Sequence, residues 1–471
     1  VSVTVNPQVT TTYWVRIKNN TCGTYTSAAT VTVNATVTIP GILSSVITTV
    51  CKNSLPQTIT LSGHTGNIVK WQYANDAAFT SGVTDIANNT TSLTPAQIGP
   101  LTATRYFRAV VQNGACSQLT TPALQLTVPA PVVWDGSWSG VPSVNTAVEV
   151  RSALTLDSDL NVCSCEVKNN AVFTVSSGVN LVVKGKITVA QGSNLVVQNN
   201  ASILQADNVA NEGNIEFHRN SSKVKRLDYT MWSSPVDGQQ LLAFSPQTLT
   251  NRFYEYVTAT DQYAAVAPQN NFETGKGYLI RTPNNHPATS TVYAGTFTGT
   301  PHNGTIEKQV NYTGTDSYNA IGNPYPSPIS VQQFIDANTG NIEGTLWFWR
   351  KTNDYTQSSY TTLTKLAYVA NRAPGGENEY AIDPNGVINA GQGFIVLSKN
   401  GGNVVFTNSM RVGNSSNQFF RMSSQEDPAS RFWLNLTDNN GSFSQAVVGY
   451  TPEATLGYDN GIDGRAFTDN N

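Results

Sequence analysis

The sequence carries little charge. Only 12% of its 471 residues are Asp, Glu, Lys or Arg, roughly half of the usual share of about 25%. The 27 basic and 30 acidic residues leave a net charge of −3, so the chain lacks the basic surface by which proteins hold nucleic acid. Its polar surface must consist of Ser, Thr, Asn and Gln, which suit strands and turns better than helices. We therefore expect an all-β protein with no nucleic-acid partner.

Long apolar runs are also missing. No stretch of 18 or more apolar residues occurs, so we expect no transmembrane segment. A signal peptide is absent too, and residues 11–17 already have the pattern of a strand. We therefore expect the sequence to be a fragment of a longer polypeptide whose export signal lies outside it.

Motifs for catalysis are scarce. The four histidines are scattered, and none stands in the setting that a Ser-His-Asp triad needs. Ser233 and Ser234 lack the flanking glycines of a nucleophile elbow, and no pair of carboxylates is marked for glycoside cleavage. The sequence therefore predicts a protein that is not an enzyme and needs no cofactor.

The five cysteines predict one disulfide. Cys51 and Cys116 flank a block of strand-like runs that contains Trp71, and this order is typical of an immunoglobulin-like domain in which a tryptophan packs on an inter-sheet bridge. We therefore predict a Cys51–Cys116 disulfide. Cys163 and Cys165, one residue apart on an expected strand, share a face and are either a strained local bridge or two reduced core thiols. Cys22 stands in a setting similar to that of Cys116, and we expect its partner to lie before this sequence begins.

Breaks in composition divide the chain into regions. A proline-rich stretch at 129–131 ends the immunoglobulin-like block. We predict the C-terminal part of an immunoglobulin-like sandwich domain at 1–38, a complete immunoglobulin-like domain at 39–129, a β-solenoid-like segment at 130–225, a duplicated β domain at 226–414 with copies at about 226–304 and 315–414, and the truncated start of a further β-sandwich at 415–471.

A short repeat underlies the solenoid prediction. Residues 177–183 recur as residues 191–197, a step of 14 residues between Gly178 and Gly192. Short β runs that are separated by Gly-Asn turns at a fixed period are typical of stacked rungs. A meander of hairpins is the alternative interpretation.

A longer duplication underlies the fourth region. Residues 272–280 resemble residues 388–396, and residues 229–235 resemble residues 318–324. Both copies contain a Gly-x-Gly pair, at Gly275 and at Gly391, but a strand pattern follows each pair where a dinucleotide-binding loop requires a helix. We therefore expect tight turns in which glycine supplies a positive φ. One short helix is expected at 330–335, with Ser330 as its cap.

Two sets of side chains are candidates for binding. Trp347 and Trp349 share one face of an expected strand and could stack on sugar rings, although burial in the core is favoured. Asp459 and Asp463 stand in an oxygen-rich loop that could hold calcium, but the spacing is not that of an EF-hand, and we favour a solvated turn.

Several of these motifs together resemble a known group of proteins. The stretch at 229–235, the turn at 275–278, the Ile-Gly-Asn-Pro-Tyr-Pro-Ser-Pro run at 321–328 and the strand at 431–436 are similar to the large secreted proteins of Bacteroidetes that are cargo of the type IX secretion system. That resemblance, over about 130–471, implies immunoglobulin-like repeats followed by a β region and, beyond this sequence, a C-terminal sorting domain. Relatives include adhesins of gliding bacteria.

The resemblance implies a route and a place of action. The partners would be the outer-membrane translocon and its shuttle β-barrel protein, which binds the sorting domain, and the protein would reach the cell surface or the medium. We expect an adhesin-like structural and binding stalk, with surface glycans as possible ligands. The alternative is a carbohydrate-binding accessory region of a secreted polysaccharide hydrolase.

Overall fold

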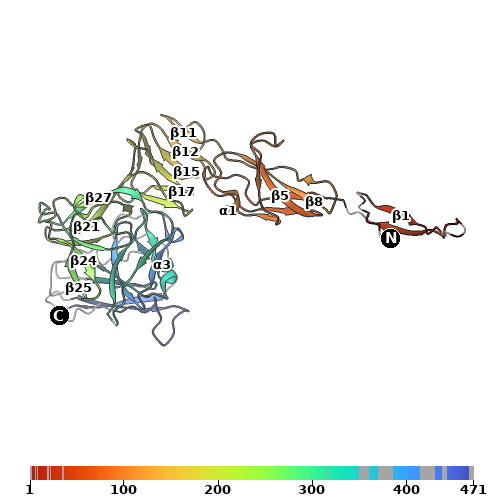
Figure 1. The fold of residues 1–471 in the computed structure, drawn as a ribbon. Helices are drawn as coiled ribbons and strands as arrows, with labels where there is room; N and C mark the ends of the chain where they lie inside the picture. Colours follow the sequence, from red (N-terminus) through yellow and green to blue (C-terminus); the bar gives the residue numbers. More distant parts are fainter. Residues whose placement is uncertain are drawn as a thin grey trace. The chain divides into compact units, whose positions relative to one another are not determined.

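The computed structural model describes most of the chain. The described residues are 3–5, 7, 9–18, 21, 23–33, 37–314, 316–349, 360–369, 386–413, 430–437 and 443–465. They form two compact units, residues 1–131 with 145–147, and residues 132–144 with 148–471. Nearly all of their regular secondary structure is strand (Figure 1), so the all-β prediction is confirmed. Within the described ranges, no helix has the length and apolarity that crossing a membrane requires.

The first unit contains a hairpin and a sandwich. The hairpin pairs β1 (Thr11–Val15) with β2 (Ala29–Val33); Cys22, between them, lies outside the described residues. One sheet of the sandwich has the order β10-β8-β5-β6, with β9 on β8, and the other has the order β3-β4-β7. The strands are β3 (Ile42–Ser44), β4 (Ile59–Ser62), β5 (Asn67–Ala74), β6 (Thr84–Ile86), β7 (Ser92–Leu93), β8 (Arg105–Gln112), β9 (Leu119–Thr120) and β10 (Leu124–Leu126).

Trp71 lies at the centre of this sandwich, as the sequence predicts. Its side chain is fully buried in the core between the two sheets. The indole Nε1–H donates to the carbonyl of Thr90 (3.1 Å), which satisfies the one polar atom of the ring. A one-turn helix, α1 (Pro95–Ile98), follows with a capping box between Thr94 and Gln97.

The predicted Cys51–Cys116 disulfide is wrong. Cys51 is disulfide-bonded, but Cys116 is a thiol. Asn53, two residues after Cys51, donates to the carbonyl of Leu101 (2.7 Å), just before β8 begins, whereas Cys116 lies beyond the end of that strand. The eight residues of β8 span on the order of 25 Å, and a disulfide needs Cα atoms within about 7 Å.

The second unit begins with a β-solenoid. Three parallel sheets, with the orders β11-β12-β15-β18, β13-β16-β19-β21 and β14-β17-β20, form its sides, and Figure 1 shows β11, β12 and β15 stacked on one of them. The strands are β11 (Val132–Trp134), β12 (Ala147–Val150), β13 (Leu154–Leu156), β14 (Leu160–Val162), β15 (Ser164–Val167), β16 (Val172–Val175), β17 (Asn180–Val183), β18 (Ile187–Val189), β19 (Asn194–Val197), β20 (Ser202–Gln205) and β21 (Ile215–Val224).

The solenoid is confirmed, but its period differs from the 14 residues read from the sequence. Cys165 pairs with Ile187, Phe173 with Leu195 and Leu181 with Ile203, a step of 22 residues in each case. The two segments that resemble each other, 177–183 and 191–197, end in β17 and β19, which belong to different sheets. The resemblance therefore reflects a corner that recurs within the solenoid and not two successive rungs. Each corner contains a glycine with a positive φ, 79° at Gly178 and 83° at Gly192.

The paired cysteines of the solenoid also differ from the expectation. Cys163 lies at the corner between β14 and β15, so the two cysteines are not on one strand. Cys163 is disulfide-bonded and Cys165 is a thiol, so a local bridge and a pair of thiols are both wrong. Burial raises the pKa of the Cys165 thiol to about 12.

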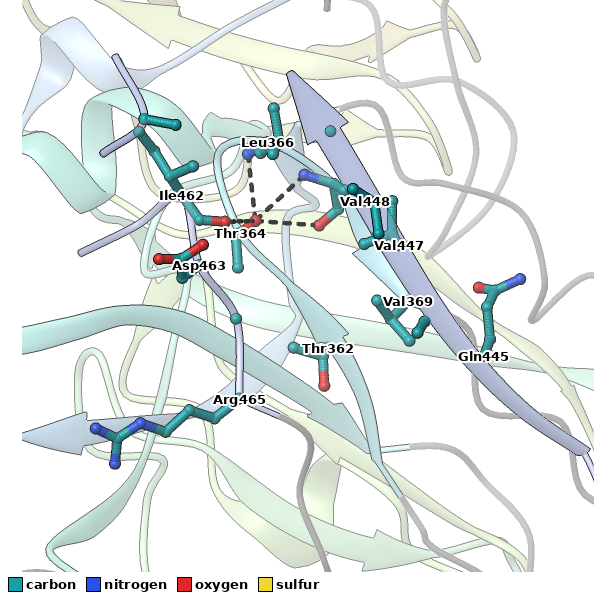
Figure 2. A pocket seen from close by; sticks show the side chains of 15 residues that line it. Thr362, Thr364, Leu366, Val369, Gln445, Val447, Val448, Ile462, Asp463 and Arg465 are labelled. Atoms are coloured by element: carbon teal, nitrogen blue, oxygen red, sulfur yellow. Dashed lines mark hydrogen bonds between the residues drawn. The ribbon is translucent and has the colours of Figure 1, made fainter. Parts of the chain in front are cut away.

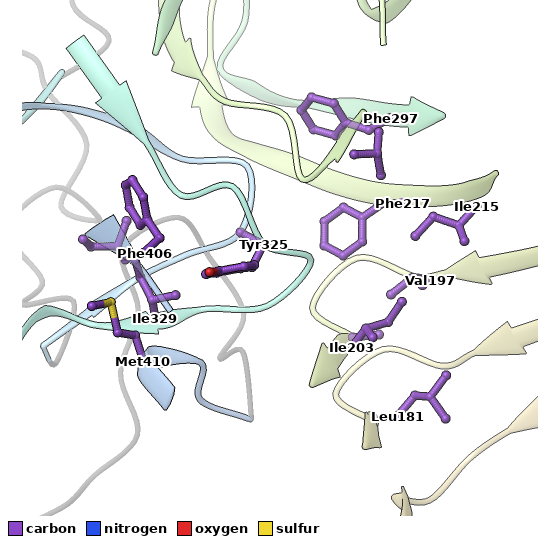
Figure 3. Packing of buried hydrophobic residues seen from close by; sticks show 14 of the residues in the cluster. Leu181, Val197, Ile203, Ile215, Phe217, Phe297, Tyr325, Ile329, Phe406 and Met410 are labelled. Atoms are coloured by element: carbon purple, nitrogen blue, oxygen red, sulfur yellow. The ribbon is translucent and has the colours of Figure 1, made fainter. Parts of the chain in front are cut away.

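The solenoid core continues into the duplicated region. Figure 3 shows Leu181, Ile203 and Phe217 from the rungs facing Tyr325 and Met410, all members of one hydrophobic cluster.

The buried Arg411 side chain fastens the last rung to the second copy. Its Nη2 donates to the carbonyl of Ile203 (2.5 Å), its Nε donates to Ser327 Oγ (3.1 Å), and its guanidinium lies 4.8 Å from the Tyr325 ring centroid. Because burial disfavours the charged form, the pKa of Arg411 falls to about 9.

The two copies of the duplicated region share a four-stranded sheet order, to which the second copy adds one strand. The sheet of the first copy has the order β22-β26-β24-β25, and that of the second has the order β29-β35-β31-β32-β33. The first copy contains β22 (Tyr229–Trp232), β23 (Val236–Asp237), α2 (Leu241–Phe244), β24 (Phe253–Val257), β25 (Gln262–Ala265), β26 (Tyr278–Arg281) and β27 (Thr291–Pro301). The second contains β29 (Tyr318–Gly322), β30 (Ile329–Ser330), α3 (Val331–Asn338), β31 (Ile342–Trp349), β32 (Tyr360–Leu363), β33 (Tyr368–Val369), β34 (Val387–Ile388), β35 (Gly393–Ser398) and β36 (Asn403–Phe406), with β28 (Ile306–Gln309) paired to β36.

The helix that the sequence predicts is α3, and the Ser330 hydroxyl caps it by accepting from the Gln333 N–H (3.3 Å).

The Gly-x-Gly pairs join the copies reciprocally. Ser233 of the first copy donates its backbone N–H to the carbonyl of Gly391, and Gly322 of the second copy donates to the carbonyl of Gly275, both at 3.0 Å. Gly275 and Gly391 have φ values of 72° and 77°, as expected of tight turns. The last two strands that the structure describes, β37 (Ser430–Thr437) and β38 (Phe443–Tyr450), form a hairpin.

Candidate functional site

A pocket of about 420 Å³ lies beside the final hairpin. This volume is in the range of small-molecule sites, about 300–1,000 Å³. Three segments form its walls: the end of β32 and the turn into β33, the inner face of β38, and a strap at residues 454–465 (Figure 2). The lining residues are Thr362, Thr364, Leu366, Ala367, Val369, Gln445, Ala446, Val447, Val448, Gly449, Ala454, Ile462, Asp463, Gly464 and Arg465.

Thr364 organises one wall of the pocket. Its Oγ1 accepts from the backbone N–H groups of Leu366 and Ala367, both at 3.2 Å. The same hydroxyl donates to the carbonyl of Ile462 in the strap (3.3 Å), as the dashed lines in Figure 2 show. The hydroxyl therefore both closes the turn and ties it to the strap.

Two side chains of β37 fix the hairpin beside this turn. The Trp433 Nε1–H donates to the carbonyl of Tyr368 (3.0 Å), and Arg431 donates to the carbonyl of Leu366. Strand β38 approaches this turn closely, since a Cβ on Gly449 would lie 2.8 Å from Leu366 Cδ2. The wall contributed by β38 is therefore held by contacts outside the hairpin itself.

The charged groups of the strap do not direct their charge into the pocket. Asp463 Oδ2 accepts the Asp459 backbone N–H (2.8 Å). The Arg465 guanidinium lies 3.6 Å from a Glu343 carboxylate oxygen and 5.2 Å from the Tyr458 ring centroid, and Figure 2 shows it pointing away. The remaining wall is aliphatic apart from Thr362 and Gln445. The exposed surface of the pocket is polar and apolar in similar amounts.

The two candidate calcium ligands are engaged in the loop. Both carboxylate oxygens of Asp459 accept from Thr455, from its N–H (2.5 Å) and from its hydroxyl (2.8 Å), while Asp463 accepts from Asp459. No group of three or more His, Cys, Asp or Glu side chains suited to a metal gathers among the residues that the structure describes. These contacts are those of a self-supporting turn.

The two candidate sugar-binding tryptophans differ in exposure. Trp347 is only 1% exposed and donates to the carbonyl of Arg465 (3.2 Å), so its ring offers no face to a sugar, and the favoured interpretation, burial in the core, is confirmed for this residue. Trp349 is half-buried and donates to the carbonyl of Tyr229 (3.1 Å). Phe348 points to the opposite core, in agreement with strand alternation.

Trp349 belongs to an aromatic cluster between the two copies. Its ring packs edge-to-face on Tyr263 of the first copy and on Tyr360 of the second, with centroids 6.1 and 5.4 Å away. The Tyr263 and Tyr360 hydroxyls are 2.6 Å apart. Further partly buried rings border the cluster, from Tyr229, Tyr254, Tyr256 and Tyr318. Sequence alternation identified the tryptophans, but the tyrosines come from strands far apart in the sequence and could not be grouped from it.

Comparison with known proteins gives two family matches. A family described as Domain of unknown function (DUF8693) matches residues 133–471, which is most of the chain. A family described as Domain of unknown function (DUF8696) matches residues 40–130, the range of the sandwich. None of the curated proteins matches the chain.

Proposed function

We propose that this chain, which belongs to the family described as Domain of unknown function (DUF8693), is part of an exported cell-surface protein of the adhesin type. Its β modules act as a structural stalk with a binding function, and no chemistry is required of them. The proposed route is the type IX secretion system, with the translocon and its shuttle β-barrel protein as partners.

The observation that carries the proposal is the oxidation state of two cysteines. Cys51 and Cys163 are disulfide-bonded, and disulfides persist in oxidising compartments and are rare in the cytosol. Both side chains are at most 3% exposed, so these bonds have a structural position. This state supports export.

The second unit supports the role of a stalk. One hydrophobic cluster extends from Val132 in the first strand of the solenoid to Met410 after the last strand of the second copy. Because the solenoid and both copies share this core, their separation would expose apolar surface at a cost of about 25 cal/mol per Å². We expect a unit with one shared core to resist separation of its parts when it is pulled.

The test is protease shaving of intact cells that produce the protein. We expect its peptides to be released from the surface, and to disappear from the shaved fraction in cells that lack the type IX translocon. Peptides that appear only after lysis would contradict surface display, and shaving that persists without the translocon would contradict the route.

The aromatic cluster favours a second candidate function, that of a carbohydrate-binding accessory region. Trp349 is half-buried among tyrosines from both copies, an arrangement that can present ring faces to a sugar. Glycan-array binding that is lost in Trp349→Ala but kept in Trp14→Ala, whose ring is 69% exposed on the hairpin, would support this function. Equal binding by both variants would contradict it.

A further inference from the structure

We propose that Arg252 and Arg281 form a binding site for the carboxylate or sulfate group of an acidic saccharide. The two arginines lie on neighbouring strands of the first copy. Arg281 ends β26, and its backbone N–H donates to the carbonyl of Arg252 (3.1 Å) just before β24. Tyr229 of β22 is the register partner of Arg281 on its other side. The three side chains therefore form one row across the sheet.

Strand alternation fixes the face on which this row lies. Leu279, two residues before Arg281, and Met231, two residues after Tyr229, both belong to the cluster between the copies. Since side chains two apart on a strand share a face, the row borders that same aromatic cluster. Tyr254 continues it, because its hydroxyl accepts from Arg252 Nη1 (2.9 Å).

Among the residues that the structure describes, no carboxylate pairs with the guanidinium groups of this row. Arg281 is only 7% exposed, yet its Nε and Nη2 are buried with no hydrogen-bond acceptor, and the same holds for Arg252 Nε. No ion pair connects either guanidinium to a carboxylate of the residues that the structure describes. A buried guanidinium whose N–H groups make no hydrogen bonds costs free energy. An anion that accepts hydrogen bonds from these N–H groups would regain that free energy.

The charge arrangement points the same way. Like charges directly opposite each other on neighbouring strands are destabilising. Burial raises the pKa of the Tyr229 hydroxyl, and both arginines lie close enough to oppose part of that rise. An anion between the two guanidiniums would convert this repulsion into two attractive contacts.

The neighbouring rings narrow the ligand class. Tyr229 and Tyr254 pack edge-to-face with centroids 6.0 Å apart, and Trp349 donates to the carbonyl of Tyr229. Two guanidinium groups beside aromatic rings suit a sugar ring that carries a carboxylate or sulfate, such as one in a uronic-acid polymer. This inference rests on the proposed function, since a surface protein is the kind that meets such polymers.

The test is calorimetric titration of the full chain with three probes: an oligogalacturonate, a neutral oligosaccharide of the same length, and sodium sulfate. We expect the oligogalacturonate to bind and the neutral sugar not to bind. Arg252→Gln and Arg281→Gln should each weaken binding by about tenfold or more, the effect expected when a charge-assisted hydrogen bond is lost. Arg226→Gln, at an exposed position, is the matched control and should bind as the unaltered chain does.

Several outcomes would overturn the proposal. They are equal binding of the neutral sugar, undiminished binding by Arg252→Gln, or binding of sulfate without the oligogalacturonate. If Arg281→Gln does not fold, Arg252→Gln decides, because Arg252 is only half-buried. Failure here leaves surface display untouched, since protease shaving does not depend on ligand.

Discussion

Gly277 and Gly393 meet where the two copies of the duplicated region join. A Cβ placed on Gly393 would lie 3.2 Å from the Cα of Gly277 and 2.6 Å from Met231 Cγ. A Cβ on Gly277 would lie 2.7 Å from the carbonyl oxygen of Ile321. The second glycine of each Gly-x-Gly pair is therefore required by a close approach of backbones across the junction, and the first by its positive φ.

Replacing either second glycine should destabilise the second unit. We expect Gly277→Ala and Gly393→Ala each to lower the free energy of unfolding by about 1–3 kcal/mol, because the added methyl group overpacks a tight junction. Urea denaturation measures the loss. Gly340→Ala is the control, since nothing lies within 4 Å of its Cβ position, and it should change stability by no more than about 0.5 kcal/mol. Equal behaviour of all three variants would contradict the close approach.

Truncating the buried Trp347 side chain should lower the free energy of unfolding of the second unit. Trp347 is 1% exposed, and Trp347→Ala should cost about 3–5 kcal/mol through lost burial and the cavity left behind. Trp14→Ala, on the exposed hairpin, should cost little. Thermal unfolding of the two variants makes the comparison, and a Trp347→Ala protein of unchanged stability would contradict the burial of this ring.

The stability of the second unit should depend on His302 at mildly acidic pH. His302 Nδ1–H donates to the carbonyl of Pro324 (3.0 Å), so Nε2 of the neutral ring accepts from the Thr274 hydroxyl (3.2 Å). Burial lowers the pKa of His302 below its ordinary value of 6.5. As the pH falls below about 6.5, the unfolded chain binds a proton that the folded chain does not, and stability is lost.

The variant His302→Gln should reduce this loss. Urea denaturation at pH 7.5 and pH 5.5 compares the variant with the unaltered chain, and the difference between the two pH values should be smaller for the variant. The same difference in both proteins would show that His302 does not contribute.

Removing divalent cations should leave the strap intact. The Asp459 and Asp463 carboxylates accept hydrogen bonds from within the loop, so we expect the same unfolding temperature with EDTA as with calcium. Metal analysis after dialysis should find no bound calcium. Stoichiometric calcium, with an unfolding temperature that falls in EDTA, would contradict this description of the loop.

The sequence predicted those features of the fold that depend on local pattern. Alternation placed Trp347 and Trp349 on one face of their strand, and the Ser330 cap and the turns at Gly275 and Gly391 follow from local backbone preferences. The duplication was visible because both copies keep the same turns at the same places.

The features that it missed depend on which strands become neighbours. The step between Gly178 and Gly192 indicated a solenoid but not that these corners lie on different sides of a rung. The order of Cys51, Trp71 and Cys116 indicated a sandwich but not that β8 separates the two cysteines. The row of Tyr229, Arg252 and Arg281 arises only when three strands pair.

The most direct test of surface display measures the redox state of the cysteines in the producing cell. Cells are quenched in acid, thiols are alkylated during lysis, and peptides are mapped before and after reduction. We expect Cys51 and Cys163 to be alkylated only after reduction, with no peptide that links Cys51 to Cys116. Alkylation of both Cys51 and Cys163 without reduction would show that the protein resides in a reducing compartment and would contradict the account.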